Sequence, residues 1–149
     1  MCLRVLNDAW PAYLTTVGER GYPQTRAMFN LRNKRYFPKL ESLFLRLEKE
    51  FTTIFTTNTS STKIDDIKKH SKVSVYYCVP DESRGVMLSG DIEIVDDVKL
   101  KKALWHDEWE RYYPEGYNDP DHTVLRLEPI LIRGWNQTHT FRLNLGEKE

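Results

Sequence analysis

The sequence has few cysteines, no excess of charge of either sign and no long apolar run. Its 149 residues include only Cys2 and Cys78, too few for a disulfide framework or a cysteine-based zinc site. Lys and Arg together number 22, as do Asp and Glu, so a general attraction to nucleic acid or to an anionic membrane is not expected. The segment Met1–Asp8 breaks its apolar run too early for a signal peptide, and no stretch could span a bilayer. We therefore expect a cytoplasmic protein.

Familiar catalytic motifs are also missing. The sequence contains no P-loop, no G-x-G-x-x-G dinucleotide fingerprint and no G-x-S-x-G nucleophile elbow. Its four histidines lie far apart, without a second ligand at metal-binding spacing: His70, His106, His122 and His139. We expect no metal site, and the sequence offers no obvious general acid or base.

What is present indicates one folded domain over residues 1–149. Apolar residues make up 40% of the chain and aromatic residues 12%, which excludes a disordered or collagen-like protein. No internal repeat and no low-complexity linker marks a domain boundary.

The order of elements indicates a mainly β protein. Six or seven segments are rich in strand formers, several of them with alternating polarity, and are predicted to be strands: 12–17, 24–31, 51–57, 73–79, 86–95, 123–127 and 130–135. Short helices are predicted after Pro38, over 63–70 and after Asp97. Hairpins or single helices join the strands, which favours an antiparallel sheet. We predict a six-stranded antiparallel β-barrel with peripheral helices.

The predicted strand 24–31 has two different faces. Ala27, Phe29 and Leu31 share one face, and Arg26 and Met28 share the other. We expect a half-buried strand that carries a cation on its second face. A lone strand arginine is most often a solvated surface residue, and this alternative stays open.

Hydroxyl side chains are concentrated where the predicted strand 51–57 leads into the helix 63–70. The segment 57–62 holds five Ser and Thr residues and one Asn, and Lys63 follows. The first amides of a helix have no partners inside the helix, so amide, hydroxyl and ammonium donors could bind a phosphate there. The simpler alternative is a capping box formed by Thr62 and Asp65. Together with Arg26, Lys63 suggests an anionic ligand with phosphate geometry.

These segments resemble the pyridoxamine 5'-phosphate oxidase-like split barrels. The likeness rests on the opening hairpin at 13–28, the F-T-T-N-x-x-S-T-K segment at 55–63, and the two strands at 73–77 and 88–95. The W-E-x-x-Y-P-x-G stretch at 109–116, followed by D-P-D at 119–121, is similar to the general stress protein branch. The resemblance implies a six-stranded split barrel that forms a homodimer and binds FMN at the dimer interface.

The resemblance also implies roles for individual residues. Arg26 and Lys63 would hold the FMN phosphate, with help from Ser61 and Thr62. Trp135 matches a C-terminal tryptophan that closes the pocket from the partner subunit.

Further residues of the resemblance would surround the flavin itself. Ala27, Met28 and Phe29 would present their backbone to the isoalloxazine ring. Thr56 and Thr57 would line the ring and the ribityl chain.

One departure from the family pattern narrows the function. The phosphate oxidases proper carry an Arg-x-His signature that meets the substrate, and here Arg142-Leu143-Asn144 lacks the histidine. This disfavours oxidation of a vitamin phosphate and favours the general stress branch, with an unknown small-molecule substrate and a nicotinamide compound as a possible electron donor. The alternatives are a flavin-binding stress protein without turnover, a haem- or deazaflavin-binding relative, and a barrel that binds single-stranded nucleic acid, which the zero net charge disfavours.

The loop 112–121 is the candidate cover over the flavin. It holds three tyrosines, two prolines and one glycine, a composition typical of a shaped loop rather than of a flexible linker. The alternative is that these tyrosines pack the end of a helix onto the barrel.

Overall fold

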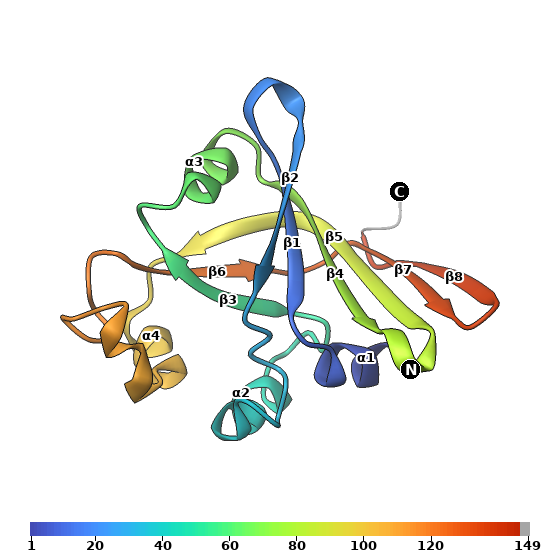
Figure 1. Ribbon diagram of the computed structural model, residues 1–149, viewed down its shortest axis with the longest axis horizontal. Coiled ribbons are helices and arrows are strands. Elements are labelled where there is room, and N and C mark those ends of the chain that lie inside the picture. Colours follow the sequence, from blue (N-terminus) through green and yellow to red (C-terminus); the bar gives the residue numbers. More distant parts are fainter. Residues whose placement is uncertain (147–149) are drawn as a thin grey trace.

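A curved antiparallel sheet forms most of the molecule, shown in Figure 1 as a computed structural model that describes residues 1–146. The strands are β1 (Ala12–Val17), β2 (Pro23–Met28), β3 (Thr53–Asn58), β4 (Lys72–Val79), β5 (Arg84–Val95), β6 (His122–Leu127), β7 (Leu131–Asn136) and β8 (His139–Asn144). The α-helices are α1 (Cys2–Asp8), α2 (Glu41–Leu45), α3 (Thr62–Lys69) and α4 (Val98–Leu104). Four short 3₁₀ helices are η1 (Glu19–Gly21), η2 (Pro38–Leu40), η3 (Pro80–Glu82) and η4 (Asp107–Arg111). Within residues 1–146, no helix is long and apolar enough to cross a membrane.

The strands follow the order β2-β1-β4-β5-β6-β3, and each pairing is antiparallel. This curled path of six strands confirms the predicted mainly β split barrel. The sheet has eight strands in total, because β7 also pairs with β5 and β8 pairs with β7. The β7–β8 hairpin extends to the right of the barrel in Figure 1.

Strand β5 bends and joins the two halves of the sheet. Its first part pairs with β4 and β7, whereas residues 92–95 pair with β6. Gly90 lies just before this change of partner. A Cβ atom there would lie 3.1 Å from the Glu128 carbonyl oxygen and 3.1 Å from Leu127 Cδ1. The close approach of the two chain segments therefore favours glycine, because a Cβ atom would make them move slightly apart.

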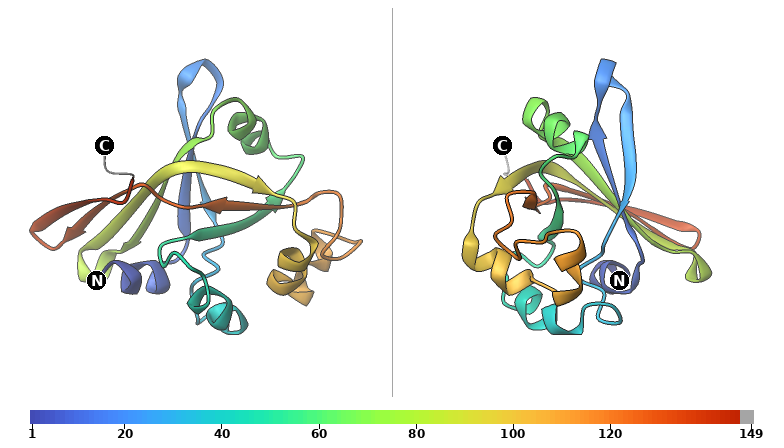
Figure 2. Two further views of the ribbon diagram at one scale, coloured as in Figure 1. Left: turned by 180° about the vertical axis from the view of Figure 1, so that it is seen from behind. Right: turned by 60° about the vertical axis from the view of Figure 1, so that its left-hand side comes forward.

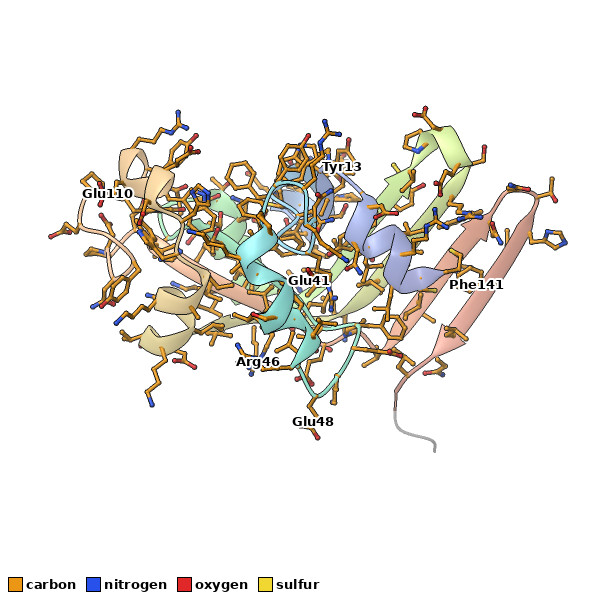
Figure 3. The ribbon with its side chains drawn as sticks, turned by 90° about the horizontal axis from the view of Figure 1, so that it is seen from below. Tyr13, Glu41, Arg46, Glu48, Glu110 and Phe141 are labelled. Carbon is orange, nitrogen blue, oxygen red and sulfur yellow. The ribbon has the colours of Figure 1, made fainter. Side chains whose placement is uncertain are left out.

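Two hydrophobic cores lie on opposite sides of β3 and β6. Phe55 and Leu125 point into the inner core, which α1 and the strands of the barrel enclose. Ile54 and Val124 point into the outer core, which includes aromatic residues from the helical segments. Figure 2 shows α2 and α4 on this outer side, and the view from below in Figure 3 shows α2 between α4 and α1. Since both faces of β3 are covered, the strand that leads to Lys63 is fixed in place.

Helix α1 was not predicted from the sequence, because its stability comes from contacts with distant residues. Its N-terminus has no side-chain cap. The buried Asn30 side chain instead donates to the carbonyl oxygens of Leu6 (2.7 Å) and Ala9 (2.8 Å) at the C-terminal end. Val5 and Leu6 are buried against the sheet. Strand β8 was also not predicted, because its side chains are mostly exposed and lack an apolar face.

Candidate functional site

Lys63 and the end of β3 form the centre of the candidate anion site. Lys63 Nζ donates to Thr57 Oγ1 and to Ser61 Oγ, both at 2.8 Å. Helix α3 begins at Thr62, with Ser61 as its N-cap residue and with no side-chain capping bond. The capping box of Thr62 and Asp65 considered from the sequence is therefore wrong. The Ser61 hydroxyl is bonded to Lys63 and does not cap the helix.

Arg26 lies beside this helix start, on β2. Its Nη1 donates to Thr16 Oγ1 (2.7 Å) and to the Gln24 carbonyl oxygen (2.9 Å). Its Nη2 lies 3.8 Å from Asp66 Oδ2 on α3, and Thr16 Oγ1 donates to the same oxygen at 3.1 Å. Arg26 is thus half-buried between the β1–β2 hairpin and α3, which are neighbours in Figure 1, and is not a freely solvated surface residue.

The electrostatics of the site show that the two cations are close. Burial lowers the pKa of Lys63, and the positive charge of Arg26 lowers it further. Burial also lowers the pKa of Arg26, against the opposing effect of Asp66. Among the described residues Arg26 has one ion-pair partner, Asp66, and Lys63 has none, so these two partly desolvated cations keep a net positive charge that an anion would neutralise.

The two faces of the segment 26–31 differ from the predicted pattern. Met28 is 7% exposed and belongs to the inner core, whereas Ala27 and Phe29 are exposed. The predicted apolar face is therefore divided, because the strand ends at Met28 and Leu31 is buried in the outer core. Met28 can offer only its backbone to a ligand.

A small aromatic cavity lies next to Phe29 and Thr56. It has a volume of about 200 Å³, and Trp109, Tyr112 and Tyr113 complete its lining. The structure thus brings together two predicted ring-lining residues and the loop that was predicted to cover them. Thr57 is different: it is 6% exposed, and its hydroxyl accepts from Lys63.

The tyrosines of the loop 112–121 differ in how deeply they are buried. Tyr113 is 5% exposed and packs against His122, with 4.8 Å between ring centroids, whereas Tyr112 is 50% exposed. Burial raises the pKa of Tyr113 to about 12, and Asp121 and Asp119 add to this effect. Tyr113 thus belongs to the packing, as the alternative interpretation states, and Tyr112 is the residue that can cover a ligand.

His122 is a buried polar residue whose role the sequence did not reveal. Its Nδ1 lies 2.7 Å from the Tyr117 carbonyl oxygen and therefore carries the proton. Its Nε2 has no partner among the described residues and is surrounded by aromatic rings. Burial is the main reason that the pKa of His122 is lowered. Within residues 1–146, no group of three or more His, Cys, Asp or Glu residues could hold a metal ion.

Trp135 lies apart from the other predicted site residues. It is on β7, which lies on the opposite side of the molecule from α3 in Figure 1. The side chain is 39% exposed and contacts Tyr76 edge-on, with 6.1 Å between ring centroids. A single chain therefore does not bring Trp135 to Lys63.

Comparison with known proteins identifies the family. Residues 44–145 match the family model described as pyridoxamine 5'-phosphate oxidase like. A solved structure from Clostridium acetobutylicum, described as related to general stress protein 26 of B. subtilis (pyridoxinephosphate oxidase family), has 27% identity and a TM-score of 0.74, over 95% of this chain and 90% of that one. No curated protein matches.

Two more distant structures share the fold and are described by a cofactor. One is a pyridoxamine 5'-phosphate oxidase-related, FMN binding protein from Nostoc punctiforme, with 15% identity and a TM-score of 0.54, over 92% of this chain and 88% of that one. The other is a heme binding protein from Mycobacterium smegmatis, with 14% identity and a TM-score of 0.66, over 95% of this chain and 56% of that one. With the family model matched over two thirds of the sequence, the chain belongs to the pyridoxamine 5'-phosphate oxidase-like family.

Proposed function

We propose that this protein binds FMN, with the phosphate at the start of α3. The observation that supports this most directly is the convergence of Arg26 and Lys63, two partly desolvated cations of which only Arg26 has an ion-pair partner among the described residues, Asp66. Ser61 and Thr62 lie at the first turn of α3, where backbone N–H groups and the helix dipole favour an anion. These residues fit the phosphate group of the cofactor in charge and in donor chemistry.

The flavin ring would lie along the exposed end of β2. Ala27 and Phe29 expose this edge, and Thr56 lies at the neighbouring cavity. Thr57 acts indirectly in this arrangement, because its hydroxyl orients Lys63. A flavin bound there would supply hydride and electron transfer, and the chain's own residues would bind it, orient it and exclude water.

We further propose that two copies of the chain complete the site. The outer face of the sheet presents an apolar row, since Ala27 lies opposite Tyr13 and Tyr13 lies opposite Tyr76 in the strand register. Tyr76 and Trp135 are exposed on this face although they are large aromatic residues. A two-fold interface over this row would bring Trp135 of one copy toward the flavin of the other. Light scattering tests this proposal, and a monomer at micromolar concentration contradicts it.

An FMN-dependent oxidoreductase of unknown substrate is the activity that we propose. A flavin-binding stress protein without turnover is the alternative within the same site. Reduction of the bound flavin by NADH or NADPH distinguishes the oxidoreductase from the binding protein, because only an oxidoreductase has to accept electrons from a donor. If no nicotinamide donor reduces the flavin, the oxidoreductase proposal fails and the binding proposal stands.

The binding proposal is tested by the cofactor that the protein retains and takes up. The purified protein should show a flavin absorption spectrum, or should quench FMN fluorescence on titration after the cofactor is removed. A haem spectrum on the purified protein, with no uptake of FMN, would contradict it. This comparison matters because one structure with the same fold is a heme binding protein.

A further inference from the structure

Asp121 joins two loops that are far apart in the sequence. Its Oδ2 accepts from Asn58 Nδ2 at 2.6 Å, and its Oδ1 accepts from the Ser60 backbone N–H at 2.8 Å. Its carbonyl oxygen accepts from the Thr59 N–H at 2.7 Å. Three consecutive residues before Ser61 are thus bonded to one aspartate.

Neighbouring contacts strengthen this connection. Thr59 Oγ1 donates to the Pro120 carbonyl oxygen at 2.9 Å and also bonds to the Thr123 hydroxyl. The buried Asp119 orders the other loop from within, because it accepts from the N–H groups of Glu115 (3.0 Å) and Asp121 (2.9 Å). The segment 58–60 is therefore bonded to an already ordered loop.

The charge of Asp121 gives no direct advantage for binding a phosphate. Among the described residues Asp121 has no ion-pair partner, and its donors are neutral amides. A carboxylate close to an anion site weakens anion binding by repulsion. It also occupies the Ser60 N–H, which could otherwise donate to a ligand. A benefit from Asp121 must therefore come through the geometry of the loop.

We propose that Asp121 is a positioning residue for the anion site. It holds the segment 58–60 so that Ser61, Thr62 and Lys63 face the phosphate, and it ties this segment to the aromatic loop 112–121. This inference rests on the proposed binding of FMN. Without Asp121 the loop has to be ordered when the ligand binds, which reduces the affinity for the phosphate-bearing ligand.

The test compares FMN with riboflavin, which has the same ring but no phosphate. In Asp121→Ala we expect FMN binding to weaken about tenfold, while riboflavin binding stays within about twofold. Asp121→Asn removes the same charge but keeps one acceptor, so its loss should be intermediate. Asp107→Asn is the matched control: it removes one negative charge from an exposed position on η4 and should leave the ratio of the two affinities unchanged.

The direction in which FMN affinity changes distinguishes a positioning role of Asp121 from charge repulsion and from a purely structural role. Repulsion alone predicts tighter FMN binding in both Asp121 variants, and a purely structural role predicts equal losses for the two flavins. Either result, or no change, overturns the inference. In a Ser61→Ala background the effect of Asp121→Ala on FMN affinity should be smaller, because the Ser61 hydroxyl, one of the groups that the loop positions, is then absent.

Three further outcomes also decide between the possibilities. If Asp121→Ala does not fold, as its melting curve would show, Asp121→Asn decides the question with the same ratio. If the wild type binds riboflavin and FMN equally, or binds neither, the proposed phosphate site fails and this inference fails with it. If the wild type prefers FMN and both Asp121 variants keep that preference in full, only this inference fails.

Discussion

Replacement of Lys63 by Met tests whether the start of α3 binds a phosphate. Met retains most of the length and apolar volume of the lysine side chain but removes its charge. In the proposed complex this ammonium group donates to the FMN phosphate, whereas riboflavin gives it no anion to contact. The substitution should therefore weaken FMN binding and leave riboflavin binding nearly unchanged.

The size of the effect follows from the surroundings of Lys63. A hydrogen bond to a charged group contributes about 1.5–3 kcal/mol, or about 10- to 150-fold in affinity. Lys63 is only half-buried, so solvent screens part of this interaction. Arg26 also stays in place and continues to attract the phosphate. We therefore expect a loss near the lower end, about 10- to 30-fold.

The stability of the protein without ligand should change in a different direction. Burial and the charge of Arg26 lower the pKa of Lys63, so the unfolded chain holds the lysine proton more tightly than the folded one. A charged Lys63 therefore reduces stability at neutral pH, and this penalty disappears only as the pH rises toward the ordinary lysine value near 10.4. Lys63→Met removes the penalty, and the melting temperature without ligand should not fall.

Fluorescence titration with FMN and riboflavin, together with thermal melts, measures both effects. Lys68→Met is the matched control, because Lys68 lies on the same helix but is exposed near its C-terminal end. It should leave both affinities unchanged. Equal losses for both flavins in Lys63→Met, or a large drop in melting temperature with an unchanged affinity ratio, would refute the phosphate assignment.

Two further predictions concern pH and the aromatic loop. Because burial lowers the pKa of His122, the unfolded state gains this proton first as the pH falls, so the melting temperature should fall from about pH 7 to about pH 5.5. His122→Asn can still donate to the Tyr117 carbonyl and should make the melting temperature less dependent on pH. The control His139→Asn, at an exposed position, should keep the pH dependence of the wild type. Equal pH dependence in all three proteins would contradict the assignment to His122. Tyr112→Ala should slow nicotinamide-driven flavin reduction without changing FMN affinity or the melting temperature, since Tyr112 is exposed. Tyr113→Ala should lower the melting temperature by about 10 °C, and a similar drop in Tyr112→Ala would show that Tyr112 packs rather than covers.

The candidate anion site could be located in the sequence because most of its parts are close together in the chain. Thr57, Ser61 and Lys63 lie within seven residues, and the change from a β-branched strand to a helix with acidic and basic ends is visible without structure. The proximity of Arg26 to this segment could be predicted only by assuming an antiparallel sheet. The link to Asp121 could not be found from spacing, because it depends on how the β3–α3 and η4–β6 connections meet in space.

The capping box, which was the simpler alternative for this segment, does not form. Thr62 and Asp65 have the spacing of a capping box, but the helix begins one residue earlier than that pattern requires. Ser61 occupies the N-cap position, and its hydroxyl accepts from Lys63. A lysine two residues after the N-cap can thus compete with the helix N–H groups for the capping oxygen, and sequence rules for caps do not include this competition.

The error on β2 has a different cause, which is informative about function. Period-two alternation separates two faces of a strand but does not say which face is the core. On β2 the face with Arg26 and Met28 turns inward, and the more apolar face with Ala27 and Phe29 stays exposed. Phe29, just after this edge strand, contacts the rings of Trp10 and Phe37 but stays 43% exposed. An isolated barrel does not require such exposure, which is why the sequence pattern alone favoured the opposite orientation. A strand that needs both a core face and an apolar outer face is better explained by a second covering surface, and the FMN ring and the partner chain proposed above are two surfaces of that kind.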